Sequence, residues 1–274
     1  MRLTRVHVAQ ALTPGSIVEL SPDTASHLAK VLRARAGDEL ILFSGDGREF
    51  LGAVETVRGS RVTASIGNGA EVDRESPLAV TLVQCVPRGD RMDFIVQKAT
   101  ELGVTRIVPV LSQRSVVRLD AAQAESKAVH WRAVAVNACE QCGRNRVPLI
   151  EAPTALIGYL GSSTGTSPRL VLEPGSESHD APTELDGAAE IAVGPEGGFA
   201  PEELEAFRIA HFARVRLGPR ILRTETAAIA ALTWLQTRFG DLRAVMSVSP
   251  RTWAAETGRS ALPTCFPSAS LMSV

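Results

Sequence analysis

Short apolar segments separated by turn residues fill the first quarter of the chain. The stretch DELILFSGDGREFLGAVETV predicts a hairpin that turns at residues 44–47, and RGSRVTASI predicts a further strand after a second turn. Between the first strands, SPDTASHLAKVLRAR carries apolar residues at helical spacing. Several short strands with one helix indicate a small β-barrel over residues 1–73.

From Leu78 onward, apolar runs alternate with helical patterns. LAVTLVQCV, RIVPVL, LVLEP, EIAVG and ARVRLG predict strands, and the unbroken first run is typical of a parallel sheet. Residues 90–103 form a helix pattern with one apolar face, residues 120–143 predict a long helix, and residues 224–239 predict a final helix. This alternation indicates an α/β domain with a mostly parallel sheet over residues 74–242.

The last segment, residues 243–274, has no sustained period and is rich in Ser and Pro, which predicts a tail without a core of its own. The whole chain has 274 residues, 45% of them hydrophobic, which is enough for a sizeable core. No run of about 18 apolar residues occurs, and the N-terminus lacks the apolar segment of a signal peptide. We therefore expect a cytoplasmic protein that does not span a membrane.

The net charge of −1 gives no general signal for nucleic-acid binding. The basic residues are nonetheless almost all arginine, since Lys30, Lys98 and Lys127 are the only lysines. The planar guanidinium of arginine suits contacts with phosphate and bases. A bias in coding composition explains the same preference, so the two interpretations stay open.

The four cysteines, Cys85, Cys139, Cys142 and Cys265, are too few for a disulfide scaffold at this length. Cys139 and Cys142 have the spacing of a metal-binding pair, but no second pair or histidine cluster completes a set of four ligands. Redox pairs lie at helix starts, whereas this pair ends a helical run. We expect no metal.

The loop GPEGGFAPEE, residues 194–203, lies between an apolar run and a helix start. It lacks the Lys and Ser/Thr of a Walker loop and does not match the dinucleotide fingerprint. The carboxylate of Glu196 would repel phosphate, while Gly197 and Gly198 allow close approach to the backbone. S-adenosylmethionine, which has a sulfonium cation and no phosphate, fits this pattern. The alternative is an ordinary turn that binds nothing.

Two further strand ends support a ligand site. In VRLGPRILRTETAAIAAL, Gly218 and Pro219 form a turn before a helix that Thr224 or Thr226 can cap, and Arg220 and Arg223 lie at its start. The third strand end offers Leu172, Glu173 and Pro174. Ligands of parallel sheets collect beyond the carboxyl ends of the strands, so we expect these three loops to meet there. Taken alone, the two arginines are equally typical of a solvated helix start.

The motifs GPEGG, LGPRILRTETA, ACEQCGR and QKATELGV together resemble the bacterial 16S ribosomal RNA (uridine-N3) methyltransferases of the SPOUT class. The resemblance extends from about Arg2 to Leu242, and RVHV, HLAKVLRARAGDEL and RESPL resemble the PUA-like RNA-binding barrel of that family. It implies an α/β SPOUT-type parallel sheet with a C-terminal trefoil knot, preceded by the small barrel. Ordinary chain topology would instead predict an unknotted sheet.

The resemblance implies methylation of N3 of a specific uridine in 16S rRNA of the small ribosomal subunit by a homodimer, with S-adenosylmethionine as methyl donor and each site completed by the partner chain. Cofactor binding is then expected from the three loops and the following helix start, through Leu172, Glu173, Pro174, Gly194, Pro195, Glu196, Gly197, Gly198, Leu217, Gly218, Arg220, Ile221, Leu222, Thr226 and Ala227.

Uridine N3 carries a proton at neutral pH, so the reaction needs that proton removed or the resulting negative charge stabilised. Arg223 and Arg144 are candidates to hold the anion, and Glu140 or Glu225 to accept the proton; Glu225 can equally orient Arg223. RNA contacts are expected from Arg5, His27, Arg33, Lys98 and Arg144, although His27 is also typical of a packed histidine. A SPOUT enzyme acting on another RNA position and a non-catalytic RNA-binding or ribosome assembly factor remain alternatives.

Overall fold

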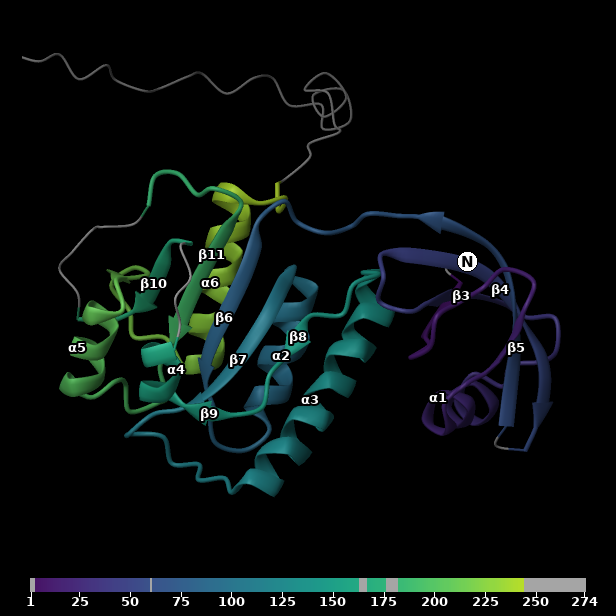
Figure 1. The fold of residues 1–274 in the computed structure, drawn as a ribbon, viewed down its shortest axis with the longest axis horizontal. Helices are drawn as coiled ribbons and strands as arrows, with labels where there is room; N and C mark the ends of the chain where they lie inside the picture. The colour runs from purple at the N-terminus through teal and green to yellow at the C-terminus, as the bar shows by residue number, and fades with distance from the viewer. Residues whose placement is uncertain (1–2, 60, 163–166, 176–181, 244–274) are drawn as a thin grey trace, which may run out of the picture. The chain divides into compact units, whose positions relative to one another are not determined.

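The structure, a computed structural model, describes residues 3–59, 61–162, 167–175 and 182–243, and residues 1–242 form one compact unit. Except for Arg243, the predicted tail lies outside the described residues. The first sheet contains β1 (Thr4–His7), β2 (Ile17–Glu19), β3 (Glu39–Phe43), β4 (Arg48–Arg58) and β5 (Arg61–Glu71), in the order β1-β3-β4-β5-β2. The β1–β3 pair is parallel and the others are antiparallel, so the sheet is mixed (Figure 1).

The predicted hairpin at residues 44–47 is confirmed as the β3–β4 connection. Between β2 and β3, the chain forms the short helix α1 (Pro22–Ser26) and one π-helical turn, η1 (His27–Val31). Leu28 from this turn packs with Leu42, Phe50 and Val62 in the core of the first sheet. That core is separate from those of the larger sheet, so the first 71 residues bury apolar side chains of their own.

The second sheet follows after residue 78, and all its strand pairs are parallel, where the sequence predicted a mostly parallel sheet. Its strands are β6 (Ala79–Cys85), β7 (Val104–Leu111), β8 (Leu149–Ile150), β9 (Thr154–Ala155), β10 (Arg169–Leu172), β11 (Ala188–Val193) and β12 (Phe212–Val215). The order is β12-β10-β11-β6-β7-β8, and β9 also pairs with β7. β10, β11, β6 and β7 lie side by side in Figure 1.

Helices cover both faces of this sheet. One face is covered by α2 (Arg91–Glu101), α3 (Ala121–Cys142) and α6 (Thr224–Phe239). Ile95, Trp131 and Leu232 of these helices lie in the core that they share with the sheet. The other face is covered by the shorter helices α4 (Leu156–Ser162) and α5 (Pro201–Ile209). No helix in the described part of the chain is long and apolar enough to cross a membrane.

The long helix α3 begins and ends where its sequence predicts. Asp120 is the N-cap and accepts from the backbone N–H of Gln123, whose side chain accepts in return from the N–H of Asp120. Gly143 ends the helix in the left-handed conformation with φ 97°, which favours glycine. The start of α6 differs from the prediction, because Arg223 is its N-cap residue and no side chain caps it. The knot stays a prediction.

Candidate functional site

The carboxyl ends of β10, β11 and β12 meet around one cavity of about 500 Å³. Its walls come from the loop after β10, the loop between β11 and α5, and the loop between β12 and α6. The lining residues are Leu172, Glu173, Pro174, Val193, Gly194, Pro195, Glu196, Gly197, Gly198, Phe199, Leu204, Val215, Arg216, Leu217, Gly218, Arg220, Ile221, Leu222, Arg223, Thr224 and Ala227. The three loops that the sequence singles out are therefore brought together.

Of the residues predicted to bind a cofactor, all but Thr226 line this cavity. Glycine is required at two of the turns by backbone conformation, since Gly198 has φ 67° and Gly218 has φ 68°. Thr226, in the first turn of α6, is exposed and lies outside the lining. Whether these residues bind a ligand stays a prediction, but the geometry required for it is present.

Thr224 joins the loop after β11 to the start of α6. It is only 4% exposed, and its hydroxyl donates to the carbonyl of Gly194 at 2.7 Å. The same oxygen accepts from Nε2 of the fully buried Gln84, at the end of β6, at 3.0 Å. The predicted capping role of Thr224 is therefore wrong, because its hydroxyl bonds across the sheet end rather than to its own helix.

The carboxylate of Glu196 points to neighbouring basic groups. Its Oε1 lies 2.6 Å from Nη1 of Arg91, the first residue of α2, and accepts from the backbone N–H of Arg88 at 3.3 Å. On the same loop, the carbonyl of Gly197 accepts from Nη1 of Arg114 at 3.1 Å. Glu196 therefore repels phosphate less than its sequence position indicates, because the paired Arg91 offsets its charge.

Two of the four catalytic candidates lie at this site. Arg223 lines the cavity, is exposed, and has no side-chain partner among the described residues. Glu225 follows in the first turn of α6, where its Oε1 lies 3.9 Å from Nε of Arg91. Arg91, rather than Arg223, is therefore the arginine that Glu225 meets.

The other two candidates lie elsewhere. Glu140, near the end of α3, accepts from the backbone N–H of His7 at 2.9 Å, and burial raises the pKa of its carboxyl group. Arg144 is 4% exposed, and its guanidinium donates to the Glu75 carboxylate and to the carbonyls of Thr100 (2.8 Å) and Val104 (2.9 Å). Neither residue lines the cavity, and the bonds of Arg144 are those of a structural residue.

The residues predicted to contact RNA have different surroundings. Arg5 is 7% exposed and bonds to Glu49 at 2.7 Å and to Asn145 at 2.5 Å, so its guanidinium faces the protein interior. Lys98 pairs with Glu101 on its own helix. His27 and Arg33 are exposed, and Arg33 has φ 53°. Of the three candidates on the first domain, His27 and Arg33 present exposed side chains and Arg5 does not.

The cysteines have the surroundings of core side chains. Cys85 and Cys139 are buried, and burial raises the pKa of the Cys139 thiol to about 12, so it stays protonated at neutral pH. The structure places no group of three or more potential metal ligands together within its described residues. Cys265 lies outside those residues.

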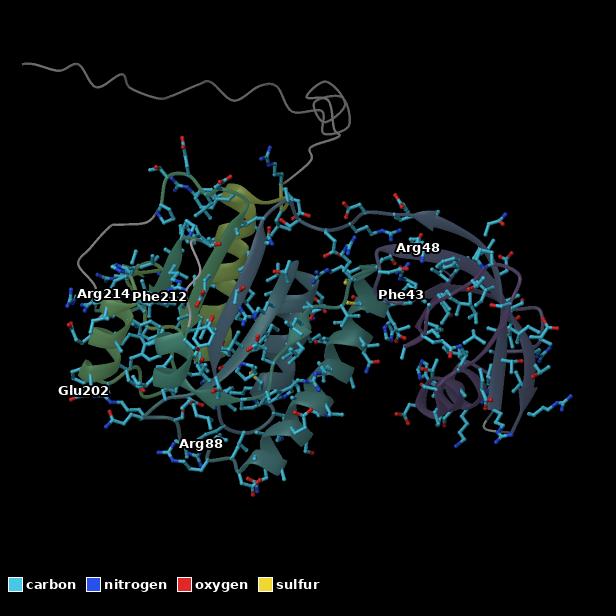
Figure 2. The ribbon with its side chains drawn as sticks, in the orientation of Figure 1. Phe43, Arg48, Arg88, Glu202, Phe212 and Arg214 are labelled. Carbon is cyan, nitrogen blue, oxygen red and sulfur yellow. The ribbon has the colours of Figure 1, made fainter. Side chains whose placement is uncertain are left out.

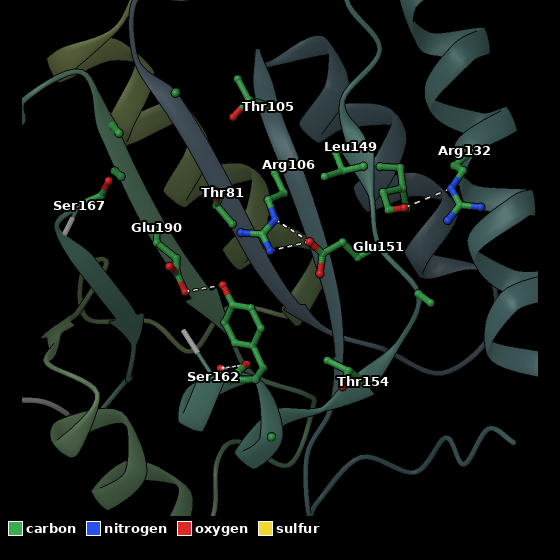
Figure 3. A pocket seen from close by; sticks show the side chains of 17 residues that line it. Thr81, Thr105, Arg106, Arg132, Leu149, Glu151, Thr154, Ser162, Ser167 and Glu190 are labelled. Atoms are coloured by element: carbon green, nitrogen blue, oxygen red, sulfur yellow. Dashed lines mark hydrogen bonds and ion pairs between the residues drawn. The ribbon is translucent and has the colours of Figure 1, made fainter. Parts of the chain in front are cut away.

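A larger cavity of about 1120 Å³ lies near the amino ends of β6, β7 and β11. Figure 3 shows its polar groups paired with one another: Arg106 bonds to Glu151 at 2.5 and 2.7 Å, and the Tyr159 hydroxyl donates to Glu190 at 2.8 Å. Burial raises the pKa of Glu190. Because these groups satisfy one another, and ligands of parallel sheets collect at the other end of the strands, we place the functional site at the smaller cavity.

Figure 2 shows Arg88 beyond the carboxyl end of β6, the strand end at which Gln84 meets Thr224. Arg88, Arg220 and Arg223 are all exposed and have no side-chain partner among the residues that the structure describes. A negatively charged ligand therefore meets uncompensated cations where it approaches this end of the sheet.

Comparison with known protein families gives two matches that divide the chain. Residues 74–236 match an RNA methyltransferase domain, and residues 20–67 match an RNA methyltransferase PUA domain. The first match contains every strand of the parallel sheet and all three loops of the cavity.

Individual relatives extend over most of the chain. A protein of Buchnera aphidicola subsp. Schizaphis graminum named ribosomal RNA small subunit methyltransferase E is 31% identical over 243 residues, covering 88% of this chain and 98% of that protein. The structure of a Neisseria gonorrhoeae protein of the same name, bound to S-adenosyl methionine, is 36% identical with a TM-score of 0.80. A putative methyltransferase from Legionella pneumophila, in complex with the same cofactor, is 38% identical with a TM-score of 0.84. Each of these structures matches 88% of this chain over its own full length.

Proposed function

Because the chain belongs to the RNA methyltransferase family, we propose that it transfers a methyl group from S-adenosylmethionine to N3 of one uridine in 16S ribosomal RNA. Relatives that match nearly their full length carry the name ribosomal RNA small subunit methyltransferase E, and two similar structures contain the cofactor. The uridine and its N3 atom come from the sequence resemblance. The observation that carries the proposal is the meeting of the three loops around one cavity.

The cavity fits S-adenosylmethionine by size and lining. Its volume of about 500 Å³ lies in the range of small-molecule sites. Leu172, Val193, Leu217 and Leu222 offer apolar surface for a flat ring, and the loop of residues 194–198 offers backbone groups for polar contacts. When bound, the cofactor supplies an activated methyl group, so the reaction needs no metal.

The protein's contribution is to orient the uracil and stabilise its anion. Arg223 is exposed at the cavity, and its guanidinium is available to hold the charge that develops on O2 and O4 as N3 loses its proton. Glu225 remains a candidate proton acceptor, because its Oε2 has no hydrogen-bond partner among the described residues. We assign no catalytic role to Arg144, whose guanidinium is occupied by interior bonds, or to Glu140, which does not line the cavity.

We further propose that rRNA contacts come from both domains. His27 and Arg33 are exposed on the first domain, and Arg88, Arg220 and Arg223 are exposed near the cavity. Contacts with phosphates make such binding weaken as salt concentration rises, and the target uridine must leave its stack to reach the cofactor. On the resemblance alone, we also propose that the protein is a homodimer with shared sites, that it has a trefoil knot at the cofactor loops, and that it acts in the cytoplasm.

The test is methyl transfer from labelled S-adenosylmethionine to small ribosomal subunits that lack the modification, followed by mass spectrometry of the nucleosides. We expect one labelled product, 3-methyluridine, in 16S rRNA. A 2′-O-methylated nucleoside would favour a related enzyme that acts on ribose. Absence of both transfer and calorimetric cofactor binding would favour an RNA-binding or assembly factor.

A further inference from the structure

Arg91 connects two segments that both border the cofactor cavity. Its Nη1 lies 2.6 Å from Oε1 of Glu196, on the loop after β11, and its Nε lies 3.9 Å from Oε1 of Glu225, at the start of α6. Arg91 itself begins α2 and does not line the cavity. One guanidinium thus meets carboxylates from two segments that are far apart in the sequence.

These two segments continue directly into walls of the cavity. Glu196 belongs to the loop of residues 194–198, which lines it. Glu225 follows Arg223 and Thr224, which line it at the end of the loop after β12. A shift of either carboxylate relative to Arg91 therefore changes the spacing between the loops.

The charges make Arg91 necessary for this arrangement. Glu196 and Glu225 both lie within 4 Å of the same guanidinium, so without it these two negatively charged carboxylates would lose the cation that they share. Arg88 contributes only its backbone N–H to Glu196, at 3.3 Å. The side chains of Glu196 and Glu225 are 34% and 16% exposed, so solvent only partly screens their repulsion.

We propose that Arg91 is a positioning residue, which holds the loop of residues 194–198 and the first turn of α6 at the spacing that S-adenosylmethionine binding requires. This inference rests on the proposed function of the cavity. It predicts an effect on cofactor affinity without any contact between Arg91 and the cofactor.

The experiment is calorimetric titration of S-adenosylmethionine into the full-length protein and its Arg91→Gln variant. Glutamine keeps much of the side-chain length but removes the charge. We expect the dissociation constant to rise about tenfold, the magnitude typical of coupling within a charged network. Arg91→Lys, which keeps the charge, should restore most of the affinity.

Two further measurements separate positioning from a general structural role. Glu196→Gln should raise the dissociation constant by a similar factor, and the double variant Arg91→Gln/Glu196→Gln should raise it no further than the larger single effect. At about 1 M salt, charges are screened over about 3 Å. The difference in dissociation constant between wild type and Arg91→Gln should therefore become smaller. The melting temperature should change by only about 2 °C, since the pair is half-exposed.

Arg208→Ala is the matched control. Arg208 pairs with Glu205 at the same 2.6 Å, on the outer surface of α5, and neither residue lines the cavity. Its loss should leave the affinity unchanged. If wild type binds and Arg91→Gln binds equally well, or if the losses of the double variant are additive, the positioning role is wrong. If wild type itself does not bind S-adenosylmethionine, the proposed function fails and this inference fails with it.

Discussion

Arg144 shows how the surroundings of a single residue decide between a catalytic and a structural role. Its side chain is 5% exposed, and that of its partner Glu75 is 15% exposed. Two of its remaining donors satisfy the carbonyls of Thr100 and Val104, at the end of α2 and the start of β7. A guanidinium with these bonds has no free donor edge for a uracil oxygen.

Arg144→Ala should therefore destabilise the fold by about 3–5 kcal/mol, because it leaves the largely buried carboxylate of Glu75 and two carbonyls without their partner. Urea denaturation measures this as a lower midpoint. The control is Arg106→Ala, which breaks a pair that is 39% and 31% exposed and should cost at most about 1 kcal/mol. A stable Arg144→Ala protein that binds cofactor but does not methylate would contradict this and restore a catalytic role.

Arg223 differs from Arg144 in being exposed at the cavity. Arg223→Ala should lower the rate of methyl transfer about 10²- to 10³-fold, as the loss of one stabiliser of a developing anion does, and change cofactor affinity less than about threefold. Single-turnover methylation and calorimetry measure the two quantities. Arg238→Ala, at the far end of α6, is the control. Equal losses of rate and affinity would make Arg223 a cofactor-binding or folding residue.

At the scale of elements, the cavity depends on bonds between strand ends and the start of α6. Thr224→Val removes the hydroxyl that donates to the half-buried carbonyl of Gly194 and accepts one of the two hydrogen bonds from the buried Gln84 amide nitrogen, which keeps its bond to the carbonyl of Cys85. We expect a loss of about 1–3 kcal/mol in unfolding free energy and weaker cofactor binding. Thr224→Ser, which keeps the hydroxyl, should retain both properties. Wild-type affinity in the valine variant would show that the loop holds its position without this bond.

Most elements were predictable because their signals are local. A few neighbouring residues are enough to recognise the apolar runs that become β6 and β7. The same holds for the ends of α3, which are marked by the N-cap Asp120 and by Gly143. Gly194 and Gly218 also marked the correct loops, because a turn before a helix start has a local signature.

The contacts between those loops were not predictable from one sequence. Arg91 and Glu196 lie 105 residues apart, and Gln84 and Thr224 lie 140 apart, so no spacing rule relates them. The same limit explains why Arg5 and Arg144 were expected to contact RNA. Arginine is a residue type typical of RNA contacts, and only the fold shows that both side chains are buried. Arg91 lies at the start of α2, outside the three loops that the sequence marked.

At the scale of the molecule, the segment after α3 joins the first sheet to the second. Arg5 of β1 bonds to Asn145, and Arg74, between the two sheets, bonds to the carbonyl of Gly143 at 2.9 Å. Glu49 of β4 accepts from both arginines, at 2.7 and 2.9 Å. These bonds lie between the domain that we expect to contact RNA and the domain that contains the cavity.

This junction should make stability depend on acid pH. Burial alone would raise the pKa of Glu49, but hydrogen bonds from Arg74, Arg5 and Asn145 outweigh it and lower the pKa from 4.5 to about 2. A lowered carboxyl pKa stabilises the fold above pH 4.5, and this contribution disappears as pH falls toward 2. Wild type should therefore be more stable than Glu49→Gln at pH 7 in urea denaturation, and the difference should shrink between pH 4.5 and 2. A difference independent of pH would contradict the assignment.

The most direct test of the account is a crystal structure of the full chain soaked with S-adenosylmethionine. We predict density for the cofactor in the cavity between residues 172–174, 194–198 and 217–222, with Arg91 behind the loop and Arg223 open toward the acceptor side. The account would be contradicted if the cofactor bound elsewhere, or if this cavity stayed empty in the soaked crystal and accepted ATP or NAD instead.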